Sequence, residues 1–533
     1  MRLPKPMPFV ALAMVLVTAL LLTACSGGGP APAGGSSGGG AGGGSGGDKT
    51  FRIAVGIDPD TLDPAGMTTT TVANMVDYIV ETLVKIDRDG NIKPGLAKSW
   101  QVAPDGRSIT FKLQEGVKFH DGTPFNAEAV KFNIERILNP DVRMPLRASY
   151  AVIERAEVVD EHTVTLHLKE PAPYLLGALT YTAAGIISPK SVNEHGNSMT
   201  AYQHPVGTGP YVLKQYTKGS QLVLEKFQDY WGEKPYYDQV VFQIVPEAAT
   251  RESLLLAGQV DMIILPPTSD IPALQNNPKV KVLLAPSDRT IFVAINTQHP
   301  ALKDKRVRQA LNYAVNKEEI IKNVLFGAAD VMDAPMAKPL LGYCQTGPYP
   351  YDPEKARQLL QEAGATNLEL KFVTPTGRYL QDYQAAQAIA NFLQEVGVKT
   401  SLSTMDWPTY QATVQVPPDK ATVQLHILGW APTFLDSQQQ MLQFTKDNHP
   451  PKGLASSYYT NPRVEELVAQ ANREVDQEKR QQLYCEAAKI IWEDAPWIFL
   501  WVQRFPIVHS AKVTNISYLP NEKFDAIYAR PAE

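Results

Sequence analysis

Residues 291–327 constrain the fold more than any other stretch of the chain. They open with the apolar run IFVAI, which is typical of a strand, and continue through a turn that contains a proline. Apolar residues then recur at helical spacing, at Val307, Ala310, Leu311, Ala314 and Val315. Asn316 restarts the pattern as an N-cap, Glu319 follows three residues later, and Gly327 is placed to end this second helix. A strand followed by two helices predicts a mixed α/β fold.

The N-terminus has the pattern of an exported protein. Arg2 and Lys5 precede an apolar run over residues 9–22, which is too short for a comfortable membrane span. The run ends in LTAC, and this pattern of Leu, two small residues and Cys resembles a bacterial lipobox. We therefore expect a lipoprotein signal peptide over residues 1–24 and lipidation of Cys25. An ordinary secretion signal with an incidental cysteine is the alternative.

Residues 25–47 continue with Gly, Ser, Ala and Pro almost throughout, which is typical of a flexible tether. Removal of Arg2 and Lys5 from the chain's 50 basic residues leaves 48 against 55 acidic residues, a net charge of −7. No basic block is present, which argues against nucleic acid as a partner. Beyond Cys25 no apolar run is long enough to span a bilayer, so a lipid anchor is the expected attachment to the membrane.

Cys344 and Cys485 are the cysteines that remain after Cys25. In an exported protein they can form a disulfide, and two separate buried thiols are the alternative. They lie beside two predicted helices, at 352–363 and about 477–492, which we expect in the same part of the fold.

Several motifs follow one another along the rest of the chain. They are PGLAKSW from residue 94, PDGRSITFKL from 104, GVKFHDGTPF from 116, PVGTGPYVL from 205 and RESLLLAGQVDMI from 251. Together with residues 291–327 they resemble the family 5 extracytoplasmic solute-binding proteins, which are the dipeptide-, oligopeptide- and nickel-binding receptors of ABC importers. The resemblance covers essentially all of residues 50–533.

The resemblance implies an α/β, bilobed periplasmic-binding-protein fold of class II, with two hinge crossings and an extra small domain in lobe one. We expect lobe one at 48–288 plus 503–533, with the small domain at about 97–200, and lobe two at 289–502. The length of 533 residues separately predicts two or three domains. The implied function is capture of a solute between the lobes and its delivery to an ABC permease and its ATPase. We expect a monomer without a cofactor, in the periplasm or at the cell surface.

The segment GWAPTFLD resembles a strand end that lines the cleft of peptide-binding members. There the backbone beside the Gly-Trp pair binds the peptide as an added strand does, so Gly429, Trp430 and Ala431 are candidate ligand contacts. Three residues after this Trp, those members carry an Asp that pairs with the ligand's α-ammonium. This chain has Thr433 there, which brings no charge. Asp436 matches a second acidic position and could replace it.

Further candidates come from other parts of the chain. Trp407 and Trp501 are candidates for the walls of the cleft, with ordinary core packing as the alternative. Arg378 follows a predicted strand and could bind a carboxylate at two points, with a surface ion pair as the alternative. The candidates from lobe one are Asp58, Thr61, Thr208 and Gly209.

Signals for catalysis and metal binding are poor. The pattern GxSxG occurs at residues 43–47, inside the tether, where composition explains it. No Walker loop or HExxH is present, and the nine histidines are scattered, with His195 and His204 nearest to a pair. We therefore expect neither an enzyme nor a metal site.

Oligopeptide is the first expected solute. A glutathione-like compound, an opine or an oligosaccharide is the alternative within this class, an extracellular hydrolase is the alternative from another class, and a sensory role is equally compatible with the sequence.

Overall fold

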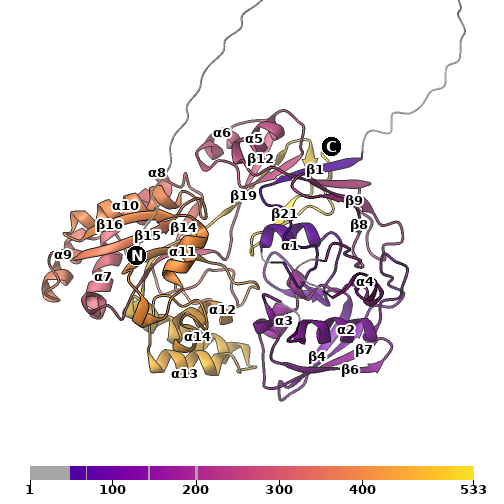
Figure 1. Ribbon diagram of the computed structural model, residues 1–533, viewed down its shortest axis with the longest axis horizontal. Coiled ribbons are helices and arrows are strands. Elements are labelled where there is room, and N and C mark those ends of the chain that lie inside the picture. Colours follow the sequence, from indigo (N-terminus) through magenta and orange to yellow (C-terminus); the bar gives the residue numbers. More distant parts are fainter. Residues whose placement is uncertain (1–48, 68, 142–143, 198–201) are drawn as a thin grey trace, which may run out of the picture. The chain divides into compact units, whose positions relative to one another are not determined.

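The computed structural model describes residues 49–67, 69–141, 144–197 and 202–533. The expected signal peptide, the tether and Cys25 lie outside the described residues. Two large sheets occupy the centres of two lobes, which we call lobe one and lobe two (Figure 1). None of the helices in the described part of the chain has both the length and the apolar character that a membrane span requires.

Lobe one is built on a sheet whose described strands have the order β12-β19-β11-β1-β10-β9-β8. They are β1 (Thr50–Val55), β8 (Tyr211–Thr217), β9 (Gln221–Lys226), β10 (Gln239–Ile244), β11 (Met262–Ile264), β12 (Val280–Ala285) and β19 (Phe505–Ser510). The central strand β1 is parallel to β10 and β11, and most of its residues are buried. Strand β19 comes from the end of the chain and pairs with β11 and β12. The sheet is thus assembled from both ends of the sequence.

Lobe two is built on a sheet with the order β14-β18-β13-β17-β15-β16 among the described strands. They are β13 (Thr290–Ile295), β14 (Ala329–Val331), β15 (Glu369–Pro375), β16 (Lys399–Met405), β17 (Leu425–Trp430) and β18 (Trp497–Gln503). Every residue of β13 is buried, because β17 and β18 flank it and apolar clusters cover both of its faces. This strand is the apolar run with which the sequence analysis began.

A smaller sheet, β4-β5-β7-β6, belongs to lobe one. Its strands are β4 (Ala97–Val102), β5 (Ser108–Leu113), β6 (Ile153–Asp160) and β7 (Thr163–Leu168). Helix α2 (Ala127–Leu138) packs on β6 and β7, and Asn126 caps it by accepting a hydrogen bond from the backbone N–H of Ala129. The inward side chains of β5 join the apolar cluster of lobe one, so the smaller sheet shares its core.

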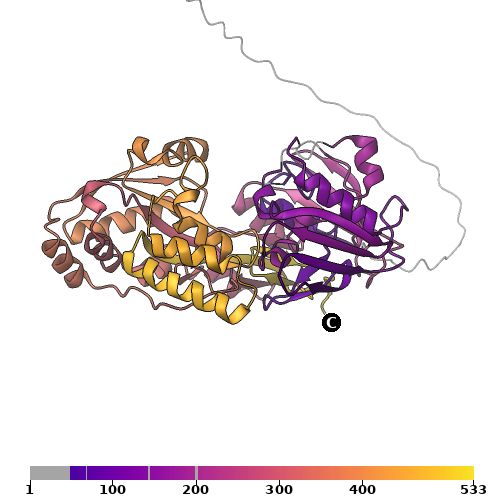
Figure 2. The same ribbon diagram turned by 90° about the horizontal axis from the view of Figure 1, so that it is seen from below.

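The remaining helices cover the sheets. In lobe one they are α1 (Thr70–Val76), α3 (Leu175–Ala178), α4 (Pro189–His195), α5 (Ala248–Leu256) and α6 (Ile271–Gln275). In lobe two they are α7 (Lys305–Ala314), α8 (Lys317–Asn323), α9 (Pro353–Glu362), α10 (Asp382–Glu395), α11 (Trp407–Val414), α12 (Ser437–Met441), α13 (Pro462–Ala471) and α14 (Gln477–Asp494). Helices α13 and α14 lie side by side, as the yellow pair in Figure 2. The predicted N-cap at Asn316 is present and accepts from the backbone N–H of Glu319.

Two-stranded sheets complete the fold. Two are hairpins, β2 (Val84–Ile86) with β3 (Ile92–Pro94) and β21 (Ser517–Leu519) with β22 (Lys523–Asp525), and the third pairs β20 (Val513–Thr514) with β23 (Arg530–Pro531).

The chain passes between the two large sheets at residues 286–289 and again at Arg504. The two passages are hydrogen-bonded to each other. The Ser287 hydroxyl donates to the carbonyl of Gln503, and the Gln503 backbone N–H donates to the carbonyl of Arg289 at 2.9 Å. The structure therefore has the two-lobed α/β fold with two crossings that the sequence predicts.

Helix α1 ends at Val76. Beyond it, the carbonyls of Tyr78 and Ile79 accept hydrogen bonds from the backbone N–H groups of Tyr211 and Gly209, at 3.0 and 2.9 Å. A Cβ atom on Gly209 would lie 2.7 Å from the carbonyl carbon of Ile79, so glycine is needed for this approach. Contacts with a distant loop thus replace the helical hydrogen bonds.

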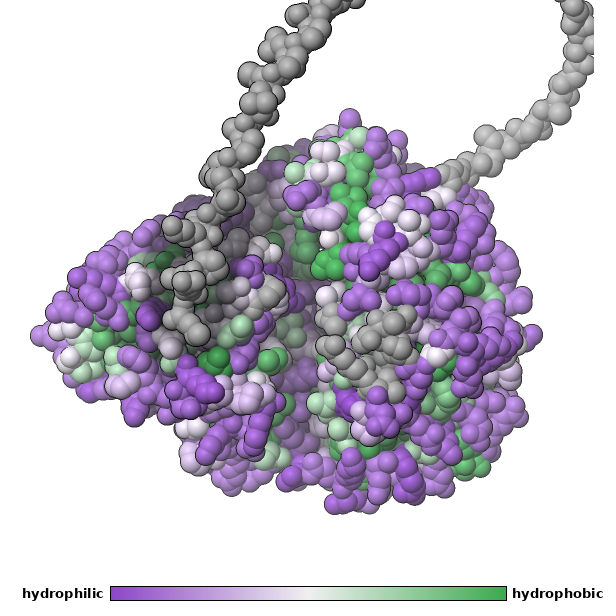
Figure 3. All heavy atoms as spheres, in the orientation of Figure 1, coloured by the Kyte–Doolittle hydropathy of each residue, from purple (hydrophilic) through white to green (hydrophobic). Residues whose placement is uncertain are grey.

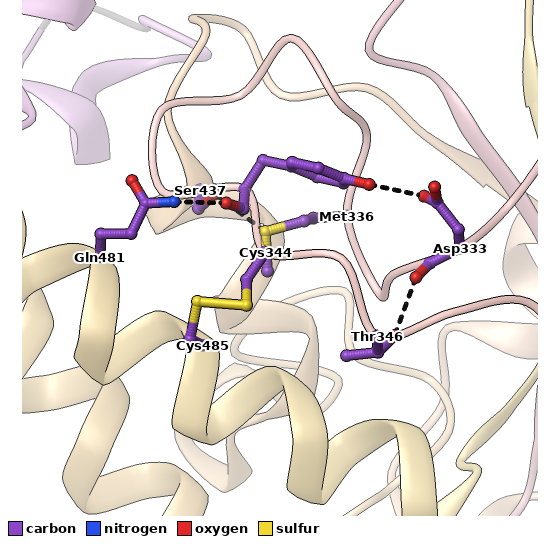
Figure 4. Close-up of a disulfide and its surroundings, with 8 residues drawn as sticks. Asp333, Met336, Cys344, Thr346, Ser437, Gln481 and Cys485 are labelled. Carbon is purple, nitrogen blue, oxygen red and sulfur yellow. Dashed lines mark hydrogen bonds between the residues drawn. A yellow bond between two sulfur atoms is a disulfide. The ribbon is translucent and has the colours of Figure 1, made fainter.

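Cys344 and Cys485 are joined by a disulfide, with their Cα atoms 5.1 Å apart (Figure 4). The bond attaches the loop after β14 to α14. Gln481, one turn before Cys485, donates to the carbonyl of Tyr343 at 2.6 Å, and the Tyr343 hydroxyl donates to Asp333 at 2.9 Å. The sequence allowed either a disulfide or two separate buried thiols, and the structure has the disulfide.

Candidate ligand-binding site

The candidate site lies where β17 ends, next to the first passage between the lobes. Trp430 is opposite Thr290, the first residue of β13, and the Thr290 hydroxyl donates to the Trp430 carbonyl at 3.2 Å. Strand β15 pairs with the first two residues of β17, and no other described strand pairs with the last residues of β17 on that side. Trp430 and the following Ala431 are half-buried. Figure 3 shows a hollow along the line where the two lobes meet, with apolar residues in its lining.

Gly429 lets an aromatic side chain approach the strand end. A Cβ atom on Gly429 would lie 2.5 Å from a ring carbon of Tyr379 and 2.7 Å from Ile291. The Tyr379 hydroxyl donates to the Gly429 carbonyl at 3.3 Å. The glycine is therefore required by packing inside lobe two, whether or not its backbone also contacts a ligand.

Arg378 presents a cation beside this strand end. Its guanidinium lies 5.1 Å from the ring centroids of both Tyr379 and Trp407. Trp407, the first residue of α11, stacks on Tyr410 with centroids 5.4 Å apart. Partial desolvation lowers the pKa of Arg378, and the nearby charge of Arg289 lowers it further.

Among the described residues, no carboxylate forms an ion pair with Arg378. Its neighbour Arg289 differs in this respect, because two hydrogen bonds of 2.7 and 2.6 Å join Arg289 to Glu522. Arg378 is thus an exposed planar cation, beside two rings, that can still bind a carboxylate at two points.

Thr433 lies at the contact between the lobes. Its backbone N–H and hydroxyl donate to the side-chain carbonyl of Gln439, at 2.8 and 3.1 Å. The Gln439 amide in turn donates to the Ser149 hydroxyl of lobe one at 2.9 Å. The next residue, Phe434, is 1% exposed and stacks on Tyr174 within the apolar cluster of lobe one. The segment after Trp430 therefore holds the two lobes together.

Asp436 has a partner inside lobe two, and this revises its predicted role. The side chain is almost fully buried and caps α12 by accepting from the backbone N–H of Gln438. Its two oxygens accept hydrogen bonds from Arg480 at 2.6 and 2.7 Å. A carboxylate that Arg480 already neutralises offers no free charge to a ligand, so Asp436 does not substitute for the acid that is absent at Thr433.

The two other tryptophan candidates differ. Trp501 is 2% exposed and packs in the core of lobe two, so the core interpretation accounts for it and the proposed role in the cleft wall is corrected. Trp430 is half-buried, and its indole N–H is buried without an acceptor among the described residues. Trp430 therefore remains a candidate and Trp501 does not.

The candidates from lobe one have structural contacts. Asp58 accepts two hydrogen bonds from the β8–β9 hairpin, each 3.0 Å long. The Thr61 hydroxyl donates to a backbone carbonyl at 3.3 Å, and the Thr208 hydroxyl donates to Glu81 at 3.1 Å. Gly209 packs against the backbone that follows α1. These contacts give all four residues a role inside lobe one.

His195 and His204, the nearest pair of histidines, stack with ring centroids 4.0 Å apart. No group of three or more metal-ligating side chains occurs in the part of the chain that the structure describes.

Sequence reasoning missed three residues of this site. Tyr379 is the immediate neighbour of Arg378, and an aromatic residue next to a candidate arginine could have been predicted to pack against it. Gln439 depends on Ser149, 290 positions away in the sequence, and no local pattern indicates that contact. Asp288 precedes β13 and was a charged residue beside a predicted crossing.

Two α/β lobes joined by two crossings, with a cation and aromatic rings at the strand end beside them, define a two-lobed solute-binding protein. A family model described as bacterial extracellular solute-binding proteins, family 5 Middle, matches residues 91–451, and the chain belongs to this family. It is 33% identical over 479 residues to the glutathione-binding protein GsiB of Pectobacterium atrosepticum, covering 89% of this chain and 92% of the relative. It is 32% identical over 480 residues to GsiB of Salmonella typhimurium, with the same coverage.

Solved structures of the same fold agree. The periplasmic binding protein DppA of Helicobacter pylori, in complex with the peptide STSA, superposes with a TM-score of 0.74 at 25% identity, covering 91% of this chain and 98% of that chain. The substrate-binding protein CtaP of Listeria monocytogenes gives a TM-score of 0.82 at 24% identity and covers 91% and 99%. These findings confirm the predicted family and fold. The relatives are binding proteins and not enzymes.

Proposed function

We propose that this protein is the receptor of an ABC importer for short peptides, and that it is held outside the cytoplasm by a lipid on Cys25. In this proposal residues 25–47 form the tether, and a monomer closes lobe one (48–288 plus 503–533) on lobe two (289–502) around the solute. The receptor then delivers the solute unchanged to the permease and its ATPase. Oligopeptides are the first class of solute to test.

Arg378 is the observation that carries the proposal of a peptide. A guanidinium that lies beside the rings of Tyr379 and Trp407, without a carboxylate partner among the described residues, is suited to the C-terminal carboxylate of a peptide. The rings stiffen its position, so less conformational entropy is lost when a ligand binds. Neither an uncharged oligosaccharide nor a simple cation would use this group.

The strand end at Trp430 supports an extended ligand. The last residues of β17 have no described strand partner on the side of β15, and the half-buried indole beside them supplies apolar surface. A peptide backbone can hydrogen-bond to such an edge while its side chains vary, which permits a receptor that tolerates many sequences.

Glutathione is a second candidate, favoured by the relatives that are 31–33% identical over most of the chain and bear the name glutathione-binding protein. As a tripeptide it carries the carboxylate that Arg378 is suited to bind. A dedicated glutathione receptor and a general peptide receptor differ in how many ligands they accept, and not in this contact.

Closure is supported by contacts between the lobes. Gln439 of lobe two donates to Ser149, Phe434 packs in the core of lobe one, and Arg473 pairs with Glu170 at 2.7 Å. A solute that contacts both lobes stabilises this closed state by its higher affinity for it. The permease then recognises closure.

The test is native mass spectrometry of residues 48–533, purified without added ligand, followed by calorimetric titration with glutathione and with a mixture of tri- to pentapeptides. Adducts spaced by amino-acid masses indicate a general peptide receptor, and a single glutathione adduct indicates a dedicated one. Binding of an opine or an oligosaccharide, with no binding of any peptide, would overturn the proposal. Conversion of the bound ligand over hours would indicate a hydrolase instead.

A further inference from the structure

Asp288 is a buried carboxylate without a partner. It lies in the first passage between the lobes, after β12 and two residues before β13, and it is 0% exposed. Neither of its side-chain oxygens accepts a hydrogen bond from another described residue. Buried carboxylates in proteins are nearly always paired or hydrogen-bonded, because desolvating an unpaired charge is costly.

The cations near Asp288 already have partners. The side chain of Arg289 is joined to Glu522 through its Nε and Nη2 atoms, and it donates no hydrogen bond to Asp288. Lys523 pairs with Asp77 at 2.6 Å. Burial raises the pKa of the Asp288 carboxyl, the charge of Glu522 raises it further, and Arg289 only partly offsets these effects. No described side chain thus supplies the cation that Asp288 lacks.

Asp288 lies in the passage between the two lobes. Burial first, and then the charges of Asp77, Asp288 and Glu522, raise the pKa of Tyr181, so this residue of lobe one lies within electrostatic reach of Asp288. On the side of lobe two, the chain continues from Asp288 to Thr290, which is opposite Trp430. Asp288 therefore lies where the lobes meet, at the strand end that forms the candidate site.

A second observation concerns the other polar atoms at this strand end. The Gln440 amide group donates to Thr290 at 3.4 Å and to the carbonyl of Pro335 at 3.0 Å, but its side-chain oxygen is buried without a donor among the described residues. The indole N–H of Trp430 is likewise buried without an acceptor. Asp288 is two residues before Thr290, Gln440 is hydrogen-bonded to Thr290, and Trp430 is opposite it, and each of the three has a buried polar atom without a partner among the described residues.

We propose that Asp288 binds the protonated amino group of the solute, with the Gln440 oxygen and the Trp430 N–H contacting its neighbouring polar atoms. This inference rests on the proposed function and makes it more specific. With Arg378 at the carboxylate and Asp288 at the amine, the solute is a zwitterion, such as a short peptide with a free amino terminus. Thr433 brings no charge to the site, and Asp288 supplies the missing one.

The same contact links binding to closure. Without a cation, the closed state must either bury an uncompensated carboxylate or protonate it, and both disfavour closure. A bound ammonium neutralises the carboxylate and removes this penalty. The ligand thus stabilises the closed state through a group that lies in the hinge.

The experiment compares two ligand mixtures on three proteins by calorimetric titration. One mixture contains glutathione and random tri- to pentapeptides with free amino groups, and the other contains the same compounds with acetylated amino groups. The proteins are residues 48–533 of the wild type, Asp288→Asn, and the matched control Asp419→Asn, which removes an exposed carboxylate of lobe two.

We expect the wild type and the control to bind the free-amine mixture on the order of 10- to 100-fold more tightly than the acetylated one, as a charge-assisted hydrogen bond predicts. Asp288→Asn should lose this preference and keep its affinity for the acetylated mixture.

The ligand-free Asp288→Asn protein should also melt at a higher temperature than the wild type, because it no longer buries an unpaired charge. A purely structural role for Asp288 would lower the melting temperature instead. If the Asn variant does not fold, Asp288→Ser is measured in its place.

The outcomes separate the two proposals. Equal binding of both mixtures by the wild type, or a preference that survives in Asp288→Asn, overturns the role of Asp288 and leaves the peptide receptor intact. No binding of either mixture by the wild type overturns the peptide receptor, and the role of Asp288 with it.

Discussion

Asp436 and Arg480 form a two-point ion pair inside lobe two, with oxygen–nitrogen distances of 2.6 and 2.7 Å and both side chains at most 3% exposed. Burial alone would lower the pKa of Arg480, but the charge of Asp436 raises it above its ordinary value. The pair fixes the start of α12 to α14, directly after the segment that contacts lobe one. It therefore supports the site from behind without offering a charge to the ligand.

Removing one member of this pair should destabilise the fold. Asp436→Asn leaves the buried guanidinium of Arg480 uncompensated, which should lower the free energy of unfolding by about 3–5 kcal/mol. Urea denaturation measures this change. Arg480→Leu combined with Asp436→Asn should recover part of the loss, because the second change removes the unpaired charge. If Asp436→Asn keeps its stability but loses ligand affinity, Asp436 is a ligand-binding residue and this prediction is wrong.

Arg378 should contribute to affinity and little to stability. Arg378→Gln should weaken binding of the peptide or glutathione ligand by about 1.5–3 kcal/mol, the range for hydrogen bonds to charged groups. The affinity of Arg378→Lys should lie between those of the wild type and Arg378→Gln, since an ammonium keeps the charge but does not make the planar two-point contact. Titration of each variant with a peptide and with its C-terminal amide checks the assignment.

The amide provides the internal control for this prediction. It lacks the carboxylate, so the wild type and Arg378→Gln should bind it equally. Arg463→Gln, which removes an exposed guanidinium on α13, should behave as the wild type with both ligands. A loss of affinity in Arg378→Gln that is the same for the acid and the amide would assign Arg378 to packing on its two rings.

Local sequence patterns predicted local structure well. The N-cap at Asn316 depends on a residue three positions away, and the central strand β13 depends on a continuous apolar run. The order of motifs along the chain predicted the two lobes and the two crossings, because a family's fold is shared even where its ligand contacts differ.

Contacts between distant residues were not predictable in this way. Asp436 and Arg480 are 44 positions apart with α12 and α13 between them, and Arg289 and Glu522 are 233 positions apart. The end of α1 at Val76 depends on hydrogen bonds from a loop more than a hundred residues later. Whether a charged residue meets a ligand or another residue is decided by such contacts, so the candidate site was only partly predictable.

The disulfide should stabilise lobe two. Cys344 and Cys485 close a loop over a sequence separation of 141 residues, and a disulfide of this kind is typically worth about 2–4 kcal/mol. The double variant Cys344→Ser, Cys485→Ser should lose this amount in urea denaturation, and reduction of the wild type should give the same value. Ligand affinity should change little, because Arg378 and Trp407 lie on other elements. Equal stability of the oxidised and reduced wild type would contradict the prediction.

Cys25 should be the site of attachment to the membrane. Cys25→Ser should move the full-length protein from the membrane fraction to the soluble extracytoplasmic fraction, because the thiol that receives the lipid is absent. Cys344→Ser is the matched control, since it removes a cysteine of the folded part, and it should stay in the membrane fraction. Retention of Cys25→Ser in the membrane fraction would refute the lipid anchor and leave the ordinary secretion signal as the explanation.

The buried His426 and the half-buried His120 should make the protein sensitive to acid. Desolvation lowers the pKa of His426 to about 3, and desolvation lowers that of His120 to about 4, against about 6.5 for an unperturbed histidine. Below about pH 6.5 the unfolded chain binds protons that the folded protein does not. The free energy of unfolding should therefore fall as the pH falls from about 6.5 toward 4, by up to about 1.4 kcal/mol per pH unit for each histidine.

The variant His426→Gln tests this linkage. Between pH 6 and 4 it should reduce the slope of the free energy of unfolding against pH by about 1.4 kcal/mol per pH unit, which corresponds to one proton. Urea denaturation in steps of half a pH unit measures this slope. His195→Gln, which alters an exposed histidine, serves as the control and should keep the slope of the wild type. Loss of the hydrogen bond between His426 and Ser456 will lower stability at every pH, and the slope separates this constant loss from the titration. A slope that is unchanged in His426→Gln would mean that other groups, such as carboxylates, determine the acid sensitivity.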